Sequence, residues 1–316
     1  MKKIFLLMAL GLASVFALGA CNSDNGNGNG AANGNSTGNI PAPTATMAET
    51  PTASNFATNR EINVVSREAG SGTRGAFIEL TGIEVRTDDG TVDQTSSEAY
   101  IAPGTSLVLG RVSTDTHALG YVSLGSLNDT VRAVPVDGVM PSVATIQNGS
   151  YPLFRDFVIA VPSDISPLAE EFLTFMLSAE GQEVVGRSYI AVDANAPSFA
   201  SSGLTGTITV LGSTSVAPVM EHLKEAFEAL NPGTTVEVQS AGSSAGINAA
   251  RDGLADLGMS SRDLNPSELE VLESVTIAHD GLAVIANHAN PVYSLTMEEV
   301  RQIFVGQLTR WDAVID

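Results

Sequence analysis

The sequence TITVLGSTSVAPVMEHLKEAFEALNPG, residues 207–233, contains the pattern that decides the fold. Its first five residues, 207–211, are rich in β-branched side chains and predict a strand. A turn of small residues, Gly212-Ser213-Thr214-Ser215, follows directly. Apolar residues then recur every three or four positions from 216 to 230, which indicates one buried face of a helix that ends at Asn231-Pro232-Gly233.

The same order of strand, small-residue turn and helix occurs twice more in the chain. The two further units are 62–66 with the turn 70–73 and the helix 74–80, and 235–239 with the turn 242–246 and a helix through Ala250. Another strand is expected at 255–259, just before Ser260-Ser261. Strands separated by helices predict βαβ units, and therefore an α/β fold with a mostly parallel sheet.

The three turns have the composition of an anion-binding site. Glycine lets a ligand approach the backbone closely, and the first turn of a helix offers unpaired N–H groups. The helix dipole and the Ser or Thr hydroxyls favour an anion further. The same residues also serve as ordinary helix caps, but three such turns in one chain favour a ligand site. None contains the Gly-Lys-Ser/Thr sequence of nucleotide-binding loops, so nucleoside triphosphates are not favoured.

Arg67 is the charged residue of the first turn, three positions before Gly70. A planar guanidinium can donate two charge-assisted hydrogen bonds to a tetrahedral oxyanion. The alternative role is a surface ion pair with Glu68 or Glu79, which would contribute little stability. The sequence favours the role in ligand binding.

The charge of the chain excludes a nucleic-acid partner. It carries 15 basic and 35 acidic residues, a net charge of −20. Binding to a phosphate backbone requires a basic surface, which this composition does not provide. Any bound anion must therefore be held by local donors.

The N-terminal residues have the features of an export signal and a tether. Lys2 and Lys3 precede an apolar stretch that ends at Leu18-Gly19-Ala20-Cys21, which predicts a secretory signal at 1–20. The sequence around Cys21 resembles a bacterial lipobox, so Cys21 is expected to be the lipid-modified first residue of the mature protein; the alternative is an unused thiol. Residues 21–59 have almost no large apolar side chains and predict a disordered tether whose ends lie about 35 Å apart.

Three long segments, 66–77, 211–220 and 239–264, resemble the phosphate-binding subunit of phosphate-specific ABC importers. The resemblance extends over 60–316 and includes the segments 121–124, 172–181 and 302–304 with Trp311. It implies a two-lobed periplasmic-binding-protein-like fold of type II, with mostly parallel sheets flanked by helices and the ligand in the cleft between the lobes. It also implies inorganic phosphate as the ligand, the permease and ATPase subunits of a membrane importer as partners, and an extracytoplasmic location with membrane attachment through a lipid anchor only. No cofactor, metal or catalytic activity is implied.

The resemblance also implies which residues bind phosphate. One lobe contributes donors from two turns, and the other lobe contributes donors from the turn that contains the arginine. These residues are Thr214, Ser215, Ser243 and Ser244 on one side, and Arg67, Ser71, Gly72 and Thr73 on the other.

One departure from the family concerns the proton of phosphate. Some members have an aspartate where this chain has Ser261, and that carboxylate accepts the proton of protonated phosphate. Sulfate has no such proton, so this acceptor provides selectivity. Here Ser261 offers only a hydroxyl, and Asp280, in His279-Asp280-Gly281, is the nearest candidate carboxylate by motif or else an ordinary turn residue.

A second departure concerns the order of the two halves. In the family, the segment similar to 203–316 comes first and the segment similar to 60–200 follows. A circular permutation explains this order, with 198–206 as the new linker; the alternative is a fragment of a longer chain with repeated domains. Permutation predicts one split lobe, 60–140 with 278–316, and one continuous lobe, 150–277, with crossings near 140–150 and 275–282.

Other functions remain open. An enzyme, such as a phosphate-ester hydrolase, would use Ser71, Ser213 or Ser243 as nucleophile and one of His117, His222, His279 or His288 as base, but no catalytic spacing is present. A receptor for sulfate or molybdate would keep the same architecture. A scaffold or adhesion role would leave the three turns without a purpose.

Overall fold

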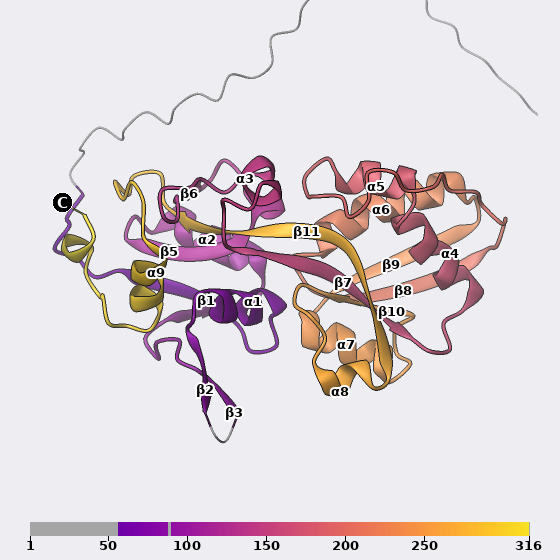
Figure 1. Ribbon diagram of the computed structural model, residues 1–316, viewed down its shortest axis with the longest axis horizontal. Helices are drawn as coiled ribbons and strands as arrows, with labels where there is room; N and C mark the ends of the chain where they lie inside the picture. The colour runs from indigo at the N-terminus through magenta and orange to yellow at the C-terminus, as the bar shows by residue number, and fades with distance from the viewer. Residues whose placement is uncertain (1–55, 88–89, 316) are drawn as a thin grey trace, which may run out of the picture. The chain divides into compact units, whose positions relative to one another are not determined.

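The computed structural model describes residues 56–87 and 90–315, which form a mixed α/β domain with helices flanking its main sheet (Figure 1). The elements follow in the order β1 (Asn63–Arg67), α1 (Gly72–Leu80), β2 (Glu84–Thr87), β3 (Gly90–Asp93), β4 (Tyr100–Ala102), α2 (Thr105–Thr114), β5 (Ala118–Ser123), η1 (Leu124–Ser126), β6 (Arg132–Ala133), α3 (Val143–Gln147), β7 (Phe154–Pro162), α4 (Pro167–Met176), α5 (Ala179–Val185), β8 (Gly206–Gly212), α6 (Ala217–Leu230), β9 (Thr234–Ser240), α7 (Ser243–Arg251), β10 (Leu257–Ser260), α8 (Pro266–Leu269), β11 (Leu272–Ala286), α9 (Met297–Phe304) and η2 (Trp311–Ala313).

The predicted strand–turn–helix units are confirmed. The strands expected at 62–66, 207–211, 235–239 and 255–259 correspond to β1, β8, β9 and β10, each shifted by no more than two residues at either end. The helices expected after the first three turns are α1, α6 and α7. The α/β class predicted from the sequence is therefore correct.

The sheet is parallel at its two ends and antiparallel in its middle. Its strands are ordered β4-β1-β5-β11-β7-β10-β8-β9, and β6 pairs with β11. Pairing is parallel among β4, β1 and β5 and among β10, β8 and β9, but β11 pairs antiparallel with both β5 and β7. The expectation of a mostly parallel arrangement is therefore wrong for the middle, because β7 and β11 run through it in opposite directions.

Two main hydrophobic cores lie toward opposite ends of the central strand β11, and β7 extends into the second of them. The first core contains Phe77, Tyr121, Phe304 and Trp311, and the second contains Phe157, Phe172, Phe175 and Phe227. Leu153, just before β7, belongs to the first core, and Phe157, within β7, belongs to the second. Along β11, Ala278 belongs to the second core and Leu282 to the first.

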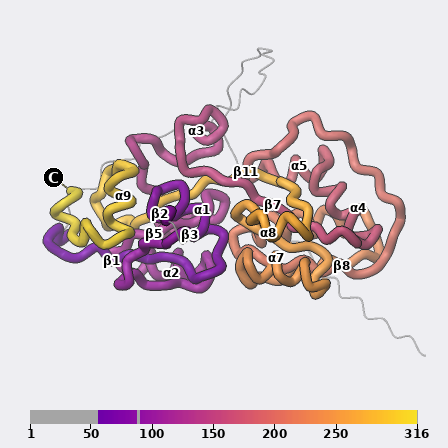
Figure 2. Tube along the Cα trace, turned by 60° about the horizontal axis from the view of Figure 1, so that its bottom comes forward, coloured from indigo at the N-terminus to yellow at the C-terminus, as the bar shows by residue number. Residues whose placement is uncertain are grey.

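The segment before β1 is paired with the last segment of the chain. The N–H of Ile62 donates to the carbonyl of Thr309 at 2.8 Å, and the N–H of Trp311 donates to the carbonyl of Arg60 at 3.1 Å. The buried Trp311 ring lies edge-on to Phe56, and its Nε1 donates to the carbonyl of His117 at 3.1 Å. Both ends of the described chain therefore lie in the first core, where α9 is close to β1 (Figure 2).

The predicted signal at 1–20, Cys21 and most of the predicted tether lie outside the described residues. Among the helices formed by 56–87 and 90–315, none combines the length and apolar character needed to cross a bilayer.

Candidate functional site

Seven hydroxyl groups gather where β1, β8 and β10 end and where α1, α2, α6 and α7 begin. We call them the hydroxyl cluster: Thr73, Thr105, Ser213, Thr214, Ser215, Ser243 and Ser261. All except Thr214 are buried. Strand ends and helix starts meet here because β1 runs opposite to β8 and β10, so the C-terminal ends of these strands point toward one another from the two halves of the domain.

The cluster joins the two halves of the domain. Thr73 Oγ1, at the start of α1, lies 2.7 Å from Ser215 Oγ and 3.5 Å from Ser261 Oγ. Thr73 adjoins the first core through α1, whereas Ser215 and Ser261 follow strands of the second core. An anion bound among these hydroxyls would therefore receive hydrogen bonds from both halves.

Directed hydrogen bonds orient the hydroxyls that follow β8 and β10. The N–H of Ser215 donates to Ser213 Oγ at 3.2 Å, and Ser213 Oγ donates to Ser261 Oγ at 2.8 Å. The N–H of Ser261 donates to Ser243 Oγ at 3.1 Å. Ser261 and Ser243 accept these bonds, so each can direct its hydroxyl proton either to a ligand or to the other hydroxyl oxygen, which lies 3.4 Å away.

Thr105 belongs to the cluster although the sequence did not single it out. Its Oγ1 lies 3.2 Å from Thr214 Oγ1 and 3.3 Å from Ser215 Oγ. It is the first residue of α2 and follows Gly104, whose φ of 100° is in the region that favours glycine. This is a fourth strand–turn–helix unit, and its signal was present in Pro103-Gly104-Thr105.

Arg67 lies against the cluster at the end of β1. Its Nη2 donates to Thr214 Oγ1 at 3.0 Å and its Nη1 to Thr105 Oγ1 at 3.4 Å. Tyr121 fixes the backbone there, since its hydroxyl accepts from the N–H of Arg67 at 3.2 Å. The side chain is only 2% exposed, so the alternative of a surface residue does not describe its position.

Arg67 nevertheless forms the ion pair with Glu68. Its Nε and Nη2 each donate to a carboxylate oxygen of Glu68 at 2.8 Å. Burial acts to raise the pKa of Glu68, but the hydrogen bonds and charge of Arg67, with the N–H of Gly104, outweigh it and leave the pKa below its ordinary value of 4.5. The Arg67–Glu68 pair at the edge of the cluster therefore carries no net formal charge.

Glycines allow the turns of the two halves to approach each other. A Cβ on Gly72 would lie 2.3 Å from Ser243 Oγ and 2.8 Å from Ser261 Oγ, so only glycine fits. Gly70 has a φ of 82°, and its carbonyl accepts from the N–H of Ser244 at 3.1 Å.

Two candidate residues lie beside the cluster with their hydroxyls engaged elsewhere. Ser71 is the N-cap of α1, and its Oγ accepts from the N–H of Arg74 at 3.3 Å. Ser244 Oγ accepts from Arg262 Nη2 at 3.4 Å. Their roles as hydroxyl donors to a ligand remain predictions.

Asp280 is buried among partners other than the cluster hydroxyls. Its Oδ2 accepts from Nη2 of Arg155 at 3.1 Å and from Nε at 3.3 Å, and its Oδ1 accepts from Ser123 Oγ at 2.8 Å. Burial raises the pKa of Asp280 above its ordinary value, against the opposing effects of Arg155 and Ser123. Asp280 as the acceptor of a ligand proton therefore also remains a prediction.

The histidines considered for catalysis have partners elsewhere. His279 Nδ1 lies 2.6 Å from Asp156 Oδ1, His288 Nε2 lies 2.9 Å from the carbonyl of Asp129, and the ring of His117 stacks on Phe56. His222 is near Glu225 on the exposed face of α6. In residues 56–87 and 90–315, none is hydrogen-bonded to Ser71, Ser213 or Ser243, and no cluster of acidic, His or Cys side chains could hold a metal.

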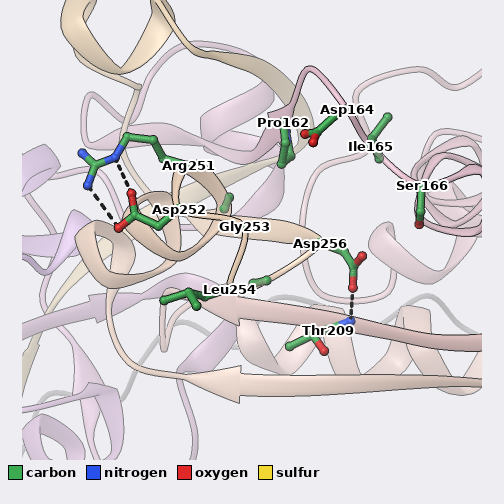
Figure 3. A pocket seen from close by; sticks show the side chains of 12 residues that line it. Pro162, Asp164, Ile165, Ser166, Thr209, Arg251, Asp252, Gly253, Leu254 and Asp256 are labelled. Carbon is green, nitrogen blue, oxygen red and sulfur yellow. Dashed lines mark hydrogen bonds and ion pairs between the residues drawn. The ribbon is translucent and has the colours of Figure 1, made fainter.

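A hollow of about 610 Å³ lies away from the cluster, between the start of α4 and the end of α7 (Figure 3). Its walls include Asp164, Asp252 and Asp256, and Arg251, its one basic lining residue, pairs with Asp252 at 2.9 Å. Asp256 accepts from the N–H of Thr209 at 2.8 Å. The acidic walls repel anions, so this hollow does not compete with the hydroxyl cluster as an anion site.

Comparison with known proteins gives consistent matches. A family model described as a PBP superfamily domain matches residues 48–180 and 197–315. The chain is 40% identical to "Phosphate-binding protein PstS 2" of Streptococcus pneumoniae serotype 4 over 314 residues, which cover 99% of each chain. It is 32% identical to "Phosphate-binding protein PstS" of Pseudomonas aeruginosa over 141 residues, which cover 42% of this chain and 43% of that one.

A solved structure supports the fold directly. The crystal structure of a phosphate ABC transporter, phosphate-binding protein from Streptococcus pneumoniae TIGR4 is 43% identical, with a TM-score of 0.65. The match covers 80% of this chain and 99% of that chain. The predicted periplasmic-binding-protein-like fold is thereby confirmed.

Proposed function

We propose that this chain is the inorganic phosphate receptor of a membrane ABC importer. The ground is that the chain belongs to the PBP superfamily and, within it, to the family of phosphate-binding proteins. The observation that carries the proposal is the hydroxyl cluster with Arg67, which gathers donors from both halves of the domain around one place. The permease and ATPase subunits of the importer are the proposed partners.

The cluster would bind phosphate mainly through oriented dipoles. Arg67 is already neutralised by Glu68, and the chain as a whole carries a net charge of −20. The hydroxyls, the N–H groups at the starts of α1, α2, α6 and α7 and the free donor capacity of the guanidinium therefore supply the attraction. Such donors are effective because burial excludes the water that would weaken each hydrogen bond.

Selectivity against sulfate depends on a proton acceptor. A hydroxyl such as that of Ser261 can accept the proton of hydrogen phosphate, but it can equally donate to a fully deprotonated anion. The carboxylate of Asp280 is engaged with Arg155, and that of Glu68 with Arg67. This arrangement makes a receptor for sulfate or molybdate the second candidate function.

Isothermal titration of the chain with phosphate, sulfate and molybdate tests the proposal. Phosphate is expected to give saturable heat at micromolar concentration, with sulfate and molybdate weaker. Saturable heat with sulfate or molybdate alone would support the second candidate. The absence of heat with phosphate would contradict the proposed function.

We also infer that the two halves are circularly permuted relative to other members of the family. The pairing of Arg60 with Trp311 supports this order, because it leaves the two ends side by side in the first core. The Streptococcus relative aligns along its whole length, so it shares the order of this chain, whereas the match to the Pseudomonas relative covers less than half of each chain, which is what a rotated order would produce. The proposed lobes are 60–140 with 278–316, and 150–277.

A lipid anchor at Cys21 and an extracytoplasmic location complete the proposal. They are supported by the sequence of residues 1–21, which has the basic start, the apolar stretch and the small residues before Cys21 of an exported lipoprotein. Mass spectrometry of the mature N-terminus should find a diacylglyceryl group on Cys21, and an unmodified Cys21 would contradict the anchor.

A receptor without catalytic activity is the final part of the proposal. It is supported by the histidine contacts described above, because none of the four histidines is hydrogen-bonded to Ser71, Ser213 or Ser243 in the described part of the chain. Assays with phosphate monoesters should detect no release of phosphate, and hydrolysis that is lost in Ser213→Ala or Ser243→Ala would contradict this.

A further inference from the structure

A row of buried polar side chains crosses four adjacent strands of the sheet and ends at the hydroxyl cluster. The strands are β5, β11, β7 and β10, and the residues are Ser123, Asp280, Arg155 and Ser261, the last directly after β10. Ser123 donates to Asp280 at 2.8 Å, Arg155 donates to Asp280 at 3.1 and 3.3 Å, and Arg155 Nη1 donates to the carbonyl of Ser261 at 3.1 Å.

The ion pair at the centre of the row is held away from water. The side chains of Arg155 and Asp280 are 4% and 1% exposed, and the two residues face each other in the register of β7 and β11. Two nitrogens of the guanidinium bind the carboxylate, so Nη1 is the donor that remains for Ser261. A buried guanidinium has few alternative partners, so the bond to Ser261 has a fixed direction.

The carbonyl of Ser261 is fixed at the same residue whose N–H and hydroxyl belong to the cluster. The N–H donates to Ser243, and the hydroxyl accepts from Ser213 and lies 3.5 Å from Thr73. The position of the Ser261 hydroxyl therefore depends on the peptide that Arg155 holds. In the described part of the chain, the Arg155 guanidinium hydrogen-bonds to Asp280 and to the Ser261 carbonyl and to no hydroxyl of the cluster, so we expect its effect on a ligand to pass through Ser261.

We propose that Arg155 is a positioning residue for the anion site, which sets the place of the Ser261 hydroxyl and which Asp280 keeps in orientation. This inference rests on the proposed phosphate-binding function. It also assigns Asp280 a role one step away from the ligand, as the counter-ion of Arg155. Since β7 and β11 pass between the two cores at these residues, the row links the site to the strands shared by both halves.

Two variants interrupt the row in different ways. Arg155→Lys keeps a positive charge for Asp280 but loses the planar fork that reaches Asp280 and Ser261 together. Arg155→Met with Asp280→Asn removes both charges, so no unpaired charge remains buried. Arg132→Lys is the matched control, because the Arg132 side chain is partly buried and its guanidinium also donates to backbone carbonyls, those of Asn290 and Val292, away from the cluster.

The test is a double-mutant cycle with Ser261→Ala, with phosphate affinity measured by titration and folding checked by thermal unfolding without phosphate. Arg155→Lys is expected to raise the Kd for phosphate about tenfold, the loss typical of one charged hydrogen bond. In the Ser261→Ala background the same change should raise Kd by less than about threefold, because the hydroxyl that Arg155 positions is absent. Arg132→Lys should leave Kd unchanged in both backgrounds.

Equal losses in the two backgrounds, or an unchanged Kd in Arg155→Lys, would overturn the inference and leave the row a purely structural feature. If Arg155→Lys does not fold, the cycle is run with the doubly neutral variant, for which the same outcomes apply. A wild-type chain that gives no heat with phosphate would contradict the proposed function instead, so the two failures are distinguishable.

Discussion

The hydroxyl oxygens of Thr73 and Ser215 lie 2.7 Å apart, although 142 positions separate these residues in the chain. Thr73 is fixed by α1, which packs in the first core, and Ser215 is fixed by the turn between β8 and α6 of the second. The contact brings the two halves of the domain together at the candidate site. Changes that prevent this approach should therefore affect ligand affinity more than folding.

Gly72→Ala is expected to weaken phosphate binding by roughly 1–3 kcal/mol, because its Cβ would overpack the space between the two turns. The added carbon would lie 2.3 Å from Ser243 Oγ. Isothermal titration measures the loss. The matched control is Gly110→Ala, on an exposed turn of α2 where a Cβ meets nothing within 4 Å; it should leave affinity unchanged, and an equal loss in both variants would contradict the explanation.

Arg67→Ala should cost about 1.5–3 kcal/mol of phosphate affinity, because it deletes charge-assisted hydrogen bonds in a buried place. The phosphate affinity of Arg67→Lys should lie between those of Arg67→Ala and the wild type, since lysine keeps the positive charge but lacks the planar guanidinium. Arg251 is the control, since it also pairs with its neighbour, Asp252, but its side chain is 46% exposed. Arg251→Ala should bind phosphate normally, and unchanged affinity in Arg67→Ala would remove Arg67 from the site.

Glu68 should make stability depend on pH in acid. Its pKa in the folded chain lies below 4.5, so its contribution is fully present above pH 4.5, where the carboxylate is ionised in both the folded and unfolded chain. As pH falls below this value, the unfolded chain binds the proton first, so the contribution of Glu68 to stability decreases. It is fully lost once the pH lies below the pKa of the folded chain as well. The melting temperatures of the wild type and Glu68→Gln, measured between pH 7 and 3, should therefore converge in acid; a constant difference would contradict the pairing with Arg67.

A reordered chain tests the permutation. Residues 203–315 followed by 56–200 should fold and bind phosphate with a Kd within about threefold of the original, because the joined ends already lie side by side. A chain opened at Ala226, inside α6, is the control and should not fold, since its new ends interrupt a helix of the second core. Failure of the first order to fold would contradict the proposed relationship between the halves.

The sequence predicts well what neighbouring residues determine. The turn 212–215 is predicted because a β-branched run precedes it and a helix with a clear apolar period follows it, and 70–73 and 242–246 repeat the order of strand, small-residue turn and helix. Thr105 was missed because β4 has only three residues, too few for alternation to indicate a strand. Candidate ligand-binding residues could therefore be predicted where the flanking strand and helix were long enough to be identified from the sequence.

Pairing between residues far apart in the chain leaves no local pattern in the sequence. Arg155 and Asp280 are 125 positions apart and meet only because β7 and β11 pair in one particular register. A change of one residue in that register would turn the two side chains to opposite faces of the sheet. Asp280 therefore looked like a turn residue or a proton acceptor, and the sequence contained no local sign of its partner.

The pairing of Arg67 with Glu68 has a consequence for the speed of capture. With the guanidinium already neutralised and a net charge of −20 on the chain, a phosphate ion approaching from solution meets a repulsive field until it reaches the short-range donors. Added salt screens that repulsion. Association should therefore become faster as ionic strength rises, the opposite of a receptor that attracts its anion with a basic surface, and the receptor is best suited to retaining phosphate rather than to attracting it.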